Sequence, residues 1–189
     1  MEELGFMKKD NRLLLLVEIA LMAAVGVILD LLSIRLWPNG GSVSLAMVPI
    51  FLIAYRRGLG AGLTTGLLVG ILQPLIVPPF YVHPIQFLLD YPIAFMIVGM
   101  AGIFSVTVDA PKRKRMTMIV LGCITGSLLR LVSHFISGVI WFGDMAPEGT
   151  PVALYSFLYN ASYLLPTAAV SIIVLALLSH QAPKLVHKQ

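Results

Sequence analysis

The long apolar stretches of this sequence contain only a few charged or imidazole side chains. These are Glu18, Asp30, Asp90, Arg130 and His134. Ionisable groups in membrane-spanning helices are costly and usually face a bundle interior or a watery cavity, so each is a candidate for function. Arg130 and His134 are four positions apart, which places them one turn apart on one face of a helix. We expect them to share a cavity with Asp90 and with Tyr91, the residue that follows it.

The last apolar stretch carries aromatic and amide side chains. Tyr155, Tyr159 and Tyr163 repeat every four residues, and Asn160 lies off that row. With the groups above, they supply a carboxylate, an imidazole, a guanidinium, an amide and several aromatic rings. This combination predicts a pocket for a small, polar, aromatic ligand.

Glu18 and Asp30 lie near opposite ends of the first apolar stretch. A charged side chain in such a position can extend to the membrane interface, which is sufficient to explain it. We therefore leave both residues out of the predicted site.

An enzyme is the alternative from a different functional class, because an Asp with a His can also perform acid-base chemistry. The sequence contains no HExxH zinc pair and no GxSxG nucleophile turn. His83 and His134 show no regular metal-ligand spacing with Asp90. We therefore expect no enzyme activity, no metal site and no cofactor. A Walker A loop is also missing, so ATP hydrolysis would need a partner.

Composition indicates that the elements holding these residues lie in a membrane. Hydrophobic residues make up 58% of the chain and charged residues 12%, and the mean hydropathy is +0.92. Soluble domains carry about half apolar and about a quarter charged residues. We predict an all-α membrane protein, a single domain over 1–189, with helices near 12–34, 43–55, 59–77, 84–107, 116–142 and 151–180. The segment 43–55 is short for a full span and contains Pro49.

Positive charge alternates between the connections. Basic clusters are Lys8, Lys9 and Arg12, then Arg56 and Arg57, then the run from Lys112 to Arg115, then Lys184 and Lys188. In the intervening loops near 35–42, 78–83 and 143–150, the only formally charged residues are Arg35, Asp144 and Glu148. The positive-inside rule then predicts six crossings with both termini in the cytoplasm. Topology thus explains the net charge of +4 better than nucleic-acid binding does.

Small residues form two stripes, one at Ala20, Ala23 and Ala24 and the other at Gly62, Gly66 and Gly70. Such stripes let helices approach closely in lipid, where packing drives association. We expect the glycine stripe to pack inside the fold. The alanine stripe is a candidate surface for a partner protein.

Several ordered segments resemble the thiamine-specific S components of energy-coupling-factor transporters. They are VEIALMAA (17–24), GGSVSLAMVPIFLIAYRRGLGAGLTTGLLVGIL (40–72), HPIQFLLDYPIAF (83–95), GSLLRLVSHFISGVIWFG (126–143) and GTPVALYSFLYNASYLLP (149–166). The resemblance covers most of the chain. It implies six helices in a bacterial plasma membrane with the vitamin bound with high affinity near the outer surface. It also implies that a coupling protein docks on Ala20, Ala23 and Ala24, and that two partner ATPases use the ATP.

The resemblance also assigns ligand contacts. The family's acidic residue before a Tyr matches Asp90 with Tyr91, and its HFxxG run matches His134 and Gly138. The basic residue four positions earlier matches Arg130, and the YSxxxN run matches Tyr155 and Asn160. A cationic thiazolium and a flat pyrimidine suit a carboxylate and aromatic rings. An S component for another vitamin or for a thiamine precursor remains the alternative ligand assignment.

The aromatic positions depart from the family pattern. Some members end the fifth helix with Phe-Trp, whereas this chain has Trp141 and Phe142, so either ring is a candidate to stack on the ligand. Trp is also common at helix ends simply as an interface anchor. Trp37 is shifted by a few positions from the loop Trp of other members, and Val69 stands where others have Trp. We include Trp37, Trp141 and Phe142 in the predicted site.

Overall fold

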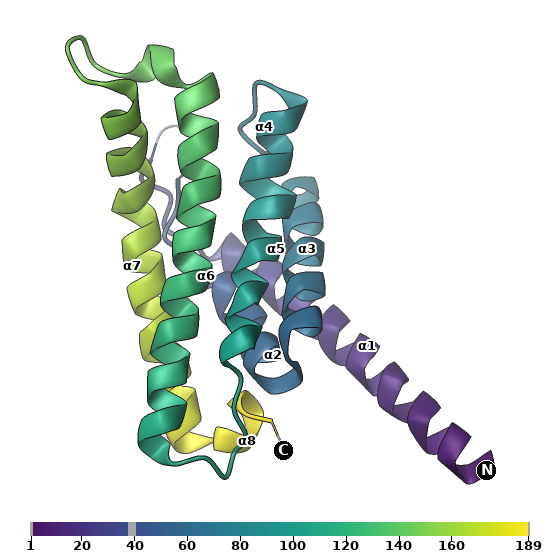
Figure 1. Ribbon diagram of the computed structural model, residues 1–189. Helices are drawn as coiled ribbons and strands as arrows, with labels where there is room; N and C mark the ends of the chain where they lie inside the picture. The colour runs from purple at the N-terminus through teal and green to yellow at the C-terminus, as the bar shows by residue number, and fades with distance from the viewer. Residues whose placement is uncertain (1, 38–40, 189) are drawn as a thin grey trace.

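The computed structural model describes residues 2–37 and 41–188 and, from residue 12 onward, the side chains within these ranges. The side chains of Lys8 and Lys9, residues 38–40 of the predicted loop, and the two terminal residues of the predicted domain lie outside them. The described residues form an all-helical fold (Figure 1) of α1 (Glu2–Leu31), α2 (Met47–Arg57), α3 (Leu59–Ile76), α4 (Pro84–Leu88), η1 (Leu89–Ile93), α5 (Ala94–Val98), η2 (Gly99–Phe104), α6 (Lys112–Trp141), η3 (Gly143–Met145), α7 (Val152–Gln181) and α8 (Pro183–Val186).

Five helical stretches of the described chain are long and apolar enough to cross a membrane: Arg12–Leu31, Leu59–Ile76, Pro84–Phe104, Lys112–Trp141 and Val152–Gln181. They match five of the predicted helices within a few residues, which confirms the all-α membrane class. The predicted segment 43–55 corresponds to α2, which is not among these stretches. The predicted count of six spans is therefore not supported by helix length alone.

α2 is short, and its apolar residues form part of the core. Its 11 residues extend about 16 Å, about half of a bilayer core. Phe51 and Tyr55 are stacked and almost fully buried, and the Tyr55 hydroxyl donates a hydrogen bond of 2.7 Å to the carbonyl of Ile119 on α6. Pro49 lies in the first turn, where a missing N–H costs little. Upstream of α2, Val43 and Ile34 exchange two backbone hydrogen bonds of 3.0 Å.

The predicted helix near 84–107 is a continuous helical stretch made of four segments, namely α4, the π-helical η1, α5 and the 3-10 helix η2. Pro92 lies inside it, and proline removes a backbone donor and crowds the preceding turn. The chain responds with the π-helical turn η1, and such turns often occur at functional sites. The Leu89 carbonyl in this turn accepts a hydrogen bond of 2.7 Å from Ser133 Oγ on α6. Asp90 and Tyr91 lie within η1.

The glycine stripe of α3 packs inside the fold, as predicted. A methyl group at Gly62 would lie 2.8 Å from the Gly99 carbonyl oxygen, and one at Gly70 would lie 2.5 Å from the Tyr91 carbonyl oxygen. A methyl group at Gly66 would collide with the backbone of Phe95. α3 thus lies against the backbone of η1, α5 and η2 and supports the turn that holds Asp90.

The first half of α1 leans away from the bundle (Figure 1). In the second half of α1, Ala20 and Ala24 are exposed, but Ala23 is 1% exposed and belongs to the core. The prediction that Ala23 contributes to a partner surface is therefore wrong, because this side of α1 packs on α2 and α3. Glu18 is paired rather than simply directed to the interface, since its carboxylate accepts hydrogen bonds of 2.6 and 2.7 Å from Arg57.

The C-terminal segment closes the end of the bundle at which both chain termini lie (Figure 1). His187 is 1% exposed, and its Nε2 lies 2.7 Å from Ser179 Oγ. The next residue, Lys188, exchanges backbone hydrogen bonds with Val106 and Val108 in the connection before α6. Burial, and to a smaller degree the charge of Arg115, lowers the pKa of His187 from 6.5 to about 4.

Acid is expected to weaken this C-terminal contact. The unfolded chain takes up a proton at His187 near pH 6.5 and the folded chain only near pH 4, so stability is complete above pH 6.5 and falls as the pH decreases towards 4. Thermal unfolding of the detergent-purified protein between about pH 7.5 and about pH 5 measures this loss, which we expect to amount to several degrees. His187→Gln should lose fewer degrees over the same interval. An equal loss in the variant would show that His187 is not the responsible group.

Candidate ligand-binding site

A cavity opens between η1, α6 and α7, at the end of the bundle away from the chain termini. Its empty space, counted together with the open solvent at its mouth, is about 810 Å³. It is lined by Asp30, Ser42, Gln73, Phe80, Gln86, Asp90, Tyr91, Phe95, Arg130, His134, Ser137, Gly138, Phe142, Met145, Tyr155, Ser156, Tyr159, Asn160 and Tyr163. All predicted site residues except Trp37 and Trp141 are among them.

Asp90 is held by neighbours on two helices. Its Oδ2 accepts hydrogen bonds from Gln86 Nε2 at 2.5 Å, one turn earlier, and from Ser137 Oγ of α6 at 2.8 Å. Its Oδ1 accepts no hydrogen bond from the described residues, although His134 Nδ1 lies 3.3 Å away. One carboxylate oxygen is thus fixed and the other is available to a ligand.

His134 and Arg130 form a chain of contacts leading to Asp90. Arg130 Nε donates to His134 Nε2 over 3.3 Å, which assigns the imidazole proton to Nδ1, the nitrogen beside Asp90. The Arg130 guanidinium carbon lies 4.0 Å from the centre of the Phe95 ring, a cation-π contact. The predicted one-turn spacing of Arg130 and His134 therefore corresponds to a direct contact.

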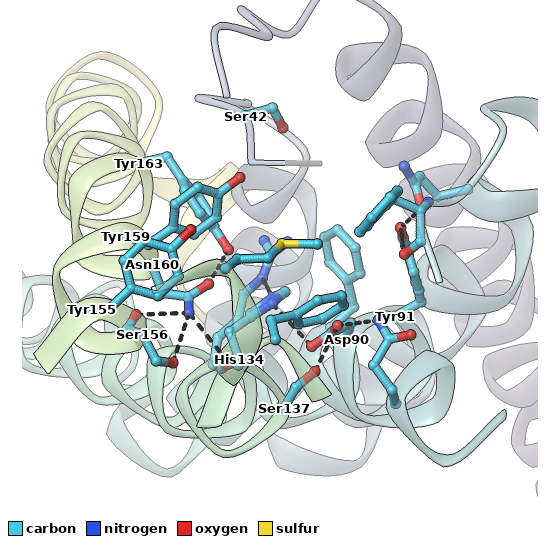
Figure 2. Close-up of a pocket in the computed structure, with 18 of the residues that line it drawn as sticks. Ser42, Asp90, Tyr91, His134, Ser137, Tyr155, Ser156, Tyr159, Asn160 and Tyr163 are labelled. Carbon is cyan, nitrogen blue, oxygen red and sulfur yellow. Dashed lines mark hydrogen bonds and ion pairs between the residues drawn. The ribbon is translucent and has the colours of Figure 1, made fainter. Parts of the chain in front are cut away.

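α7 supplies the other side of the cavity (Figure 2). Asn160 Nδ2 donates to the Ser156 carbonyl at 2.9 Å, and Asn160 Oδ1 accepts from the Tyr163 hydroxyl at 2.5 Å. α7 approaches α6 closely because Gly138 has no side chain, and a methyl group there would collide with Ser156 Oγ. Tyr155 and Tyr159 line the same side, with ring centres 6.0 Å apart.

Phe142, and not Trp141, is the helix-end ring that lines the cavity. Phe142 stacks on Phe80 with ring centres 5.7 Å apart, and the Phe80 backbone N–H donates to the Tyr91 hydroxyl at 3.0 Å. Trp141 stacks instead on His83, at 5.5 Å. One residue along a helix is a rotation of about 100°, so the order of these two rings decides which one faces the cavity.

Trp37 also lies outside the cavity lining. Its indole N–H donates to Ser162 Oγ at 2.6 Å, and its ring meets Tyr163 edge-on at 5.7 Å. Trp37 therefore supports a lining residue from behind. Its predicted contact with the ligand therefore stays a prediction, and the structure places Trp37 against Ser162 and Tyr163 of α7.

Several lining residues lie outside the predicted site, and Asp30 is one of them. Asp30 is 4% exposed and lines the cavity, so an interface position does not explain it. Gln73 and Gln86 are buried amides inside apolar stretches, and Gln86 stands one turn before Asp90. Amides at such positions are the signal that could have identified both. Ser137 and Ser156 carry no comparable signal, since serine is common in helix packing.

Comparison with known proteins agrees with this architecture. Residues 16–187 match the family described as thiamine transporter protein. The thiamine transporter ThiT of Bacillus subtilis is 47% identical over 186 residues, which are 95% of this chain and 97% of that protein. The thiamine transporter ThiT of Lacticaseibacillus paracasei is 30% identical over 187 residues, covering 95% of this chain and 93% of that protein.

A solved structure of ThiT from Listeria monocytogenes has the same fold. The two chains superpose with a TM-score of 0.86 at 31% sequence identity. The match covers 94% of this chain and 99% of that one. The helical arrangement that surrounds the cavity is therefore that of a known transporter structure.

Proposed function

The chain belongs to the thiamine transporter protein family, and from this premise we propose that it is the thiamine-binding S component of an energy-coupling-factor transporter. It is a multi-pass membrane transporter and not an enzyme. It captures thiamine with high affinity at the outer face of the bacterial plasma membrane. A coupling protein and two ATPase subunits then drive release to the inside, and ATP is used by those subunits alone.

The observation that carries the proposal is the Asp90 carboxylate facing a cavity lined by aromatic rings. Thiamine combines a cationic thiazolium with a flat aminopyrimidine. A well-placed cation over an aromatic ring contributes about 0.5 to 2 kcal/mol. The Asp90 oxygen that lacks a donor among the described residues is available to the ligand's amino group or charge. Pairing it with the ligand avoids the cost of an unpaired buried ion.

Further contacts follow from the positions of the other lining residues. Phe142 stacks on a ligand ring, and Asn160 and Tyr155 bind polar edges of the pyrimidine. His134 presents its Nδ1 proton beside Asp90, and Arg130 fixes this tautomer by donating to His134 Nε2.

Three other predicted residues shape the cavity. Tyr91 holds the Phe80 backbone over the mouth, and Gly138 provides the close approach of α7. Trp141 has an indirect role, because it holds His83 at the start of α4.

We also propose six crossings with both termini in the cytoplasm. α2 is too short to cross alone, so we infer that residues 41–46, which precede it, complete the passage. The positions of both termini at one end of the bundle support this topology (Figure 1). Ala20 and Ala24 form the exposed small-residue surface on which the coupling protein docks.

Calorimetric titration of the purified protein with thiamine, riboflavin and biotin tests the ligand. We expect saturable heat with thiamine only. Heat only with riboflavin or biotin would overturn the thiamine assignment and favour an S component for another vitamin. A thiamine precursor, the separate pyrimidine or thiazole alcohol, completes the series and distinguishes the last alternative.

A further inference from the structure

Asp30 is a buried carboxylate in the last turns of α1 that reaches the same cavity as Asp90. It is 4% exposed, and its Oδ2 accepts a hydrogen bond of 3.0 Å from Gln73 Nε2 on α3. Arg35 lies 3.4 Å from the same oxygen, and its side chain is 43% exposed. The proposed binding roles of Asp90, His134 and Asn160 assign no function to Asp30 and Gln73.

Gln73 carries an acceptor without a donor. The side chain is 9% exposed and lines the cavity, and its amide nitrogen is occupied by Asp30. Its Oε1 is buried and accepts no hydrogen bond within the described part of the chain. A buried amide oxygen without a donor is costly, so it is rarely kept without a reason.

The contact to Asp30 also fixes which way the amide points. The carboxylate is an acceptor, so the Gln73 amide must turn its nitrogen towards Asp30 and its oxygen away. The site therefore presents an acceptor, with a carboxylate behind it whose charge is partly offset by Arg35. Such a surface favours a hydrogen-bond donor and disfavours an anion.

We propose that Gln73, oriented by Asp30, accepts a hydrogen bond from the primary alcohol of the bound ligand. This inference rests on the proposed function, since the alcohol is that of the hydroxyethyl arm of thiamine. The arm is chemically separate from the two rings that Asp90 and Asn160 bind. Asp30 and Gln73 come from α1 and α3, whereas the ring-binding residues come from η1, α6 and α7. The alcohol end of the ligand is thus bound by α1 and α3, and its rings are bound by other helices.

The same arrangement disfavours a phosphate ester of this alcohol. Esterification removes the O–H donor and brings negative charge towards the Gln73 oxygen and the Asp30 carboxylate. Asp30→Asn removes the fixed negative charge while keeping the size of the side chain. We therefore expect this variant to reduce the preference for thiamine over thiamine monophosphate severalfold.

The deciding experiment is calorimetric titration with thiamine and with an analogue whose hydroxyethyl arm is an ethyl group. The unchanged protein should bind the analogue about fivefold to tenfold more weakly, as expected for one hydrogen bond. Gln73→Met should bind thiamine more weakly by a similar factor and no longer distinguish the two ligands. Thr65→Val is the matched control, because Thr65 on α3 also has a buried oxygen without a donor among the described residues but does not line the cavity.

The outcomes separate this inference from the proposed function. If the unchanged protein binds thiamine and the ethyl analogue equally, the inference is overturned without reference to any variant. An undiminished preference for the alcohol in Gln73→Met also overturns it, while thiamine binding itself stands. If the unchanged protein does not bind thiamine at all, the proposed function fails and this inference fails with it.

Discussion

Asp90→Asn is expected to weaken thiamine binding by at least about tenfold, which corresponds to the loss of about 1.5 kcal/mol from a charge-assisted hydrogen bond. The substitution keeps the shape of the side chain but removes its charge. It also leaves no good orientation for the new amide. Two donors, from Gln86 and Ser137, face the Oδ2 position, and His134 Nδ1 lies 3.3 Å from the Oδ1 position. An amide nitrogen at the Oδ2 position would meet both donors, and one at the Oδ1 position would lie beside the His134 Nδ1–H group without an acceptor from it.

Calorimetry with thiamine measures the effect. Asp144→Asn is the matched control, because Asp144 is an exposed carboxylate in η3 that does not line the cavity. It should bind thiamine as the unchanged protein does. Unaltered affinity in Asp90→Asn, with a normal thermal unfolding profile, would remove Asp90 from the binding site.

Ala20→Trp is expected to abolish thiamine uptake while leaving thiamine affinity unchanged. Ala20 and Ala24 lie one turn apart on the exposed side of α1, where small side chains permit close helix approach. A large ring there keeps a coupling helix at a distance. The ligand cavity is not lined by either residue, so binding should not respond.

Two measurements on the same variant distinguish docking from folding. Calorimetry reports thiamine binding by the purified S component, and labelled thiamine uptake is measured in vesicles that also contain the coupling protein and ATPases. Leu21→Trp is the control, since Leu21 is 56% exposed on the neighbouring side of α1. Uptake retained in Ala20→Trp, or lost equally in Leu21→Trp, would argue against the Ala20 surface as the docking face.

Much of the candidate site was accessible from the sequence because it consists of costly residues. A charged or imidazole side chain in an apolar helix needs a partner, and this argument identified Asp90, Arg130 and His134. The contact between Arg130 and His134 follows from helical periodicity alone. The same reasoning missed Asp30, because a carboxylate near a helix end has a second physical explanation. The hydrogen bond from Gln73 to Asp30 decides between an interface position and a position in the site, and it is visible only in the tertiary structure.

The sequence by itself determined the membrane class, the long apolar helices and the residue types of the pocket, since each depends on local composition or spacing. The tertiary structure decided what depends on how each helix is rotated against its neighbours. It placed Phe142 in the cavity and Trp141 outside, buried Ala23 between helices and left Ala20 exposed. It also turned the apolar run of α2 into core, because hydrophobicity drives burial in protein and in lipid alike. Long-range packing decides whether a given apolar segment is buried in the protein core or faces lipid.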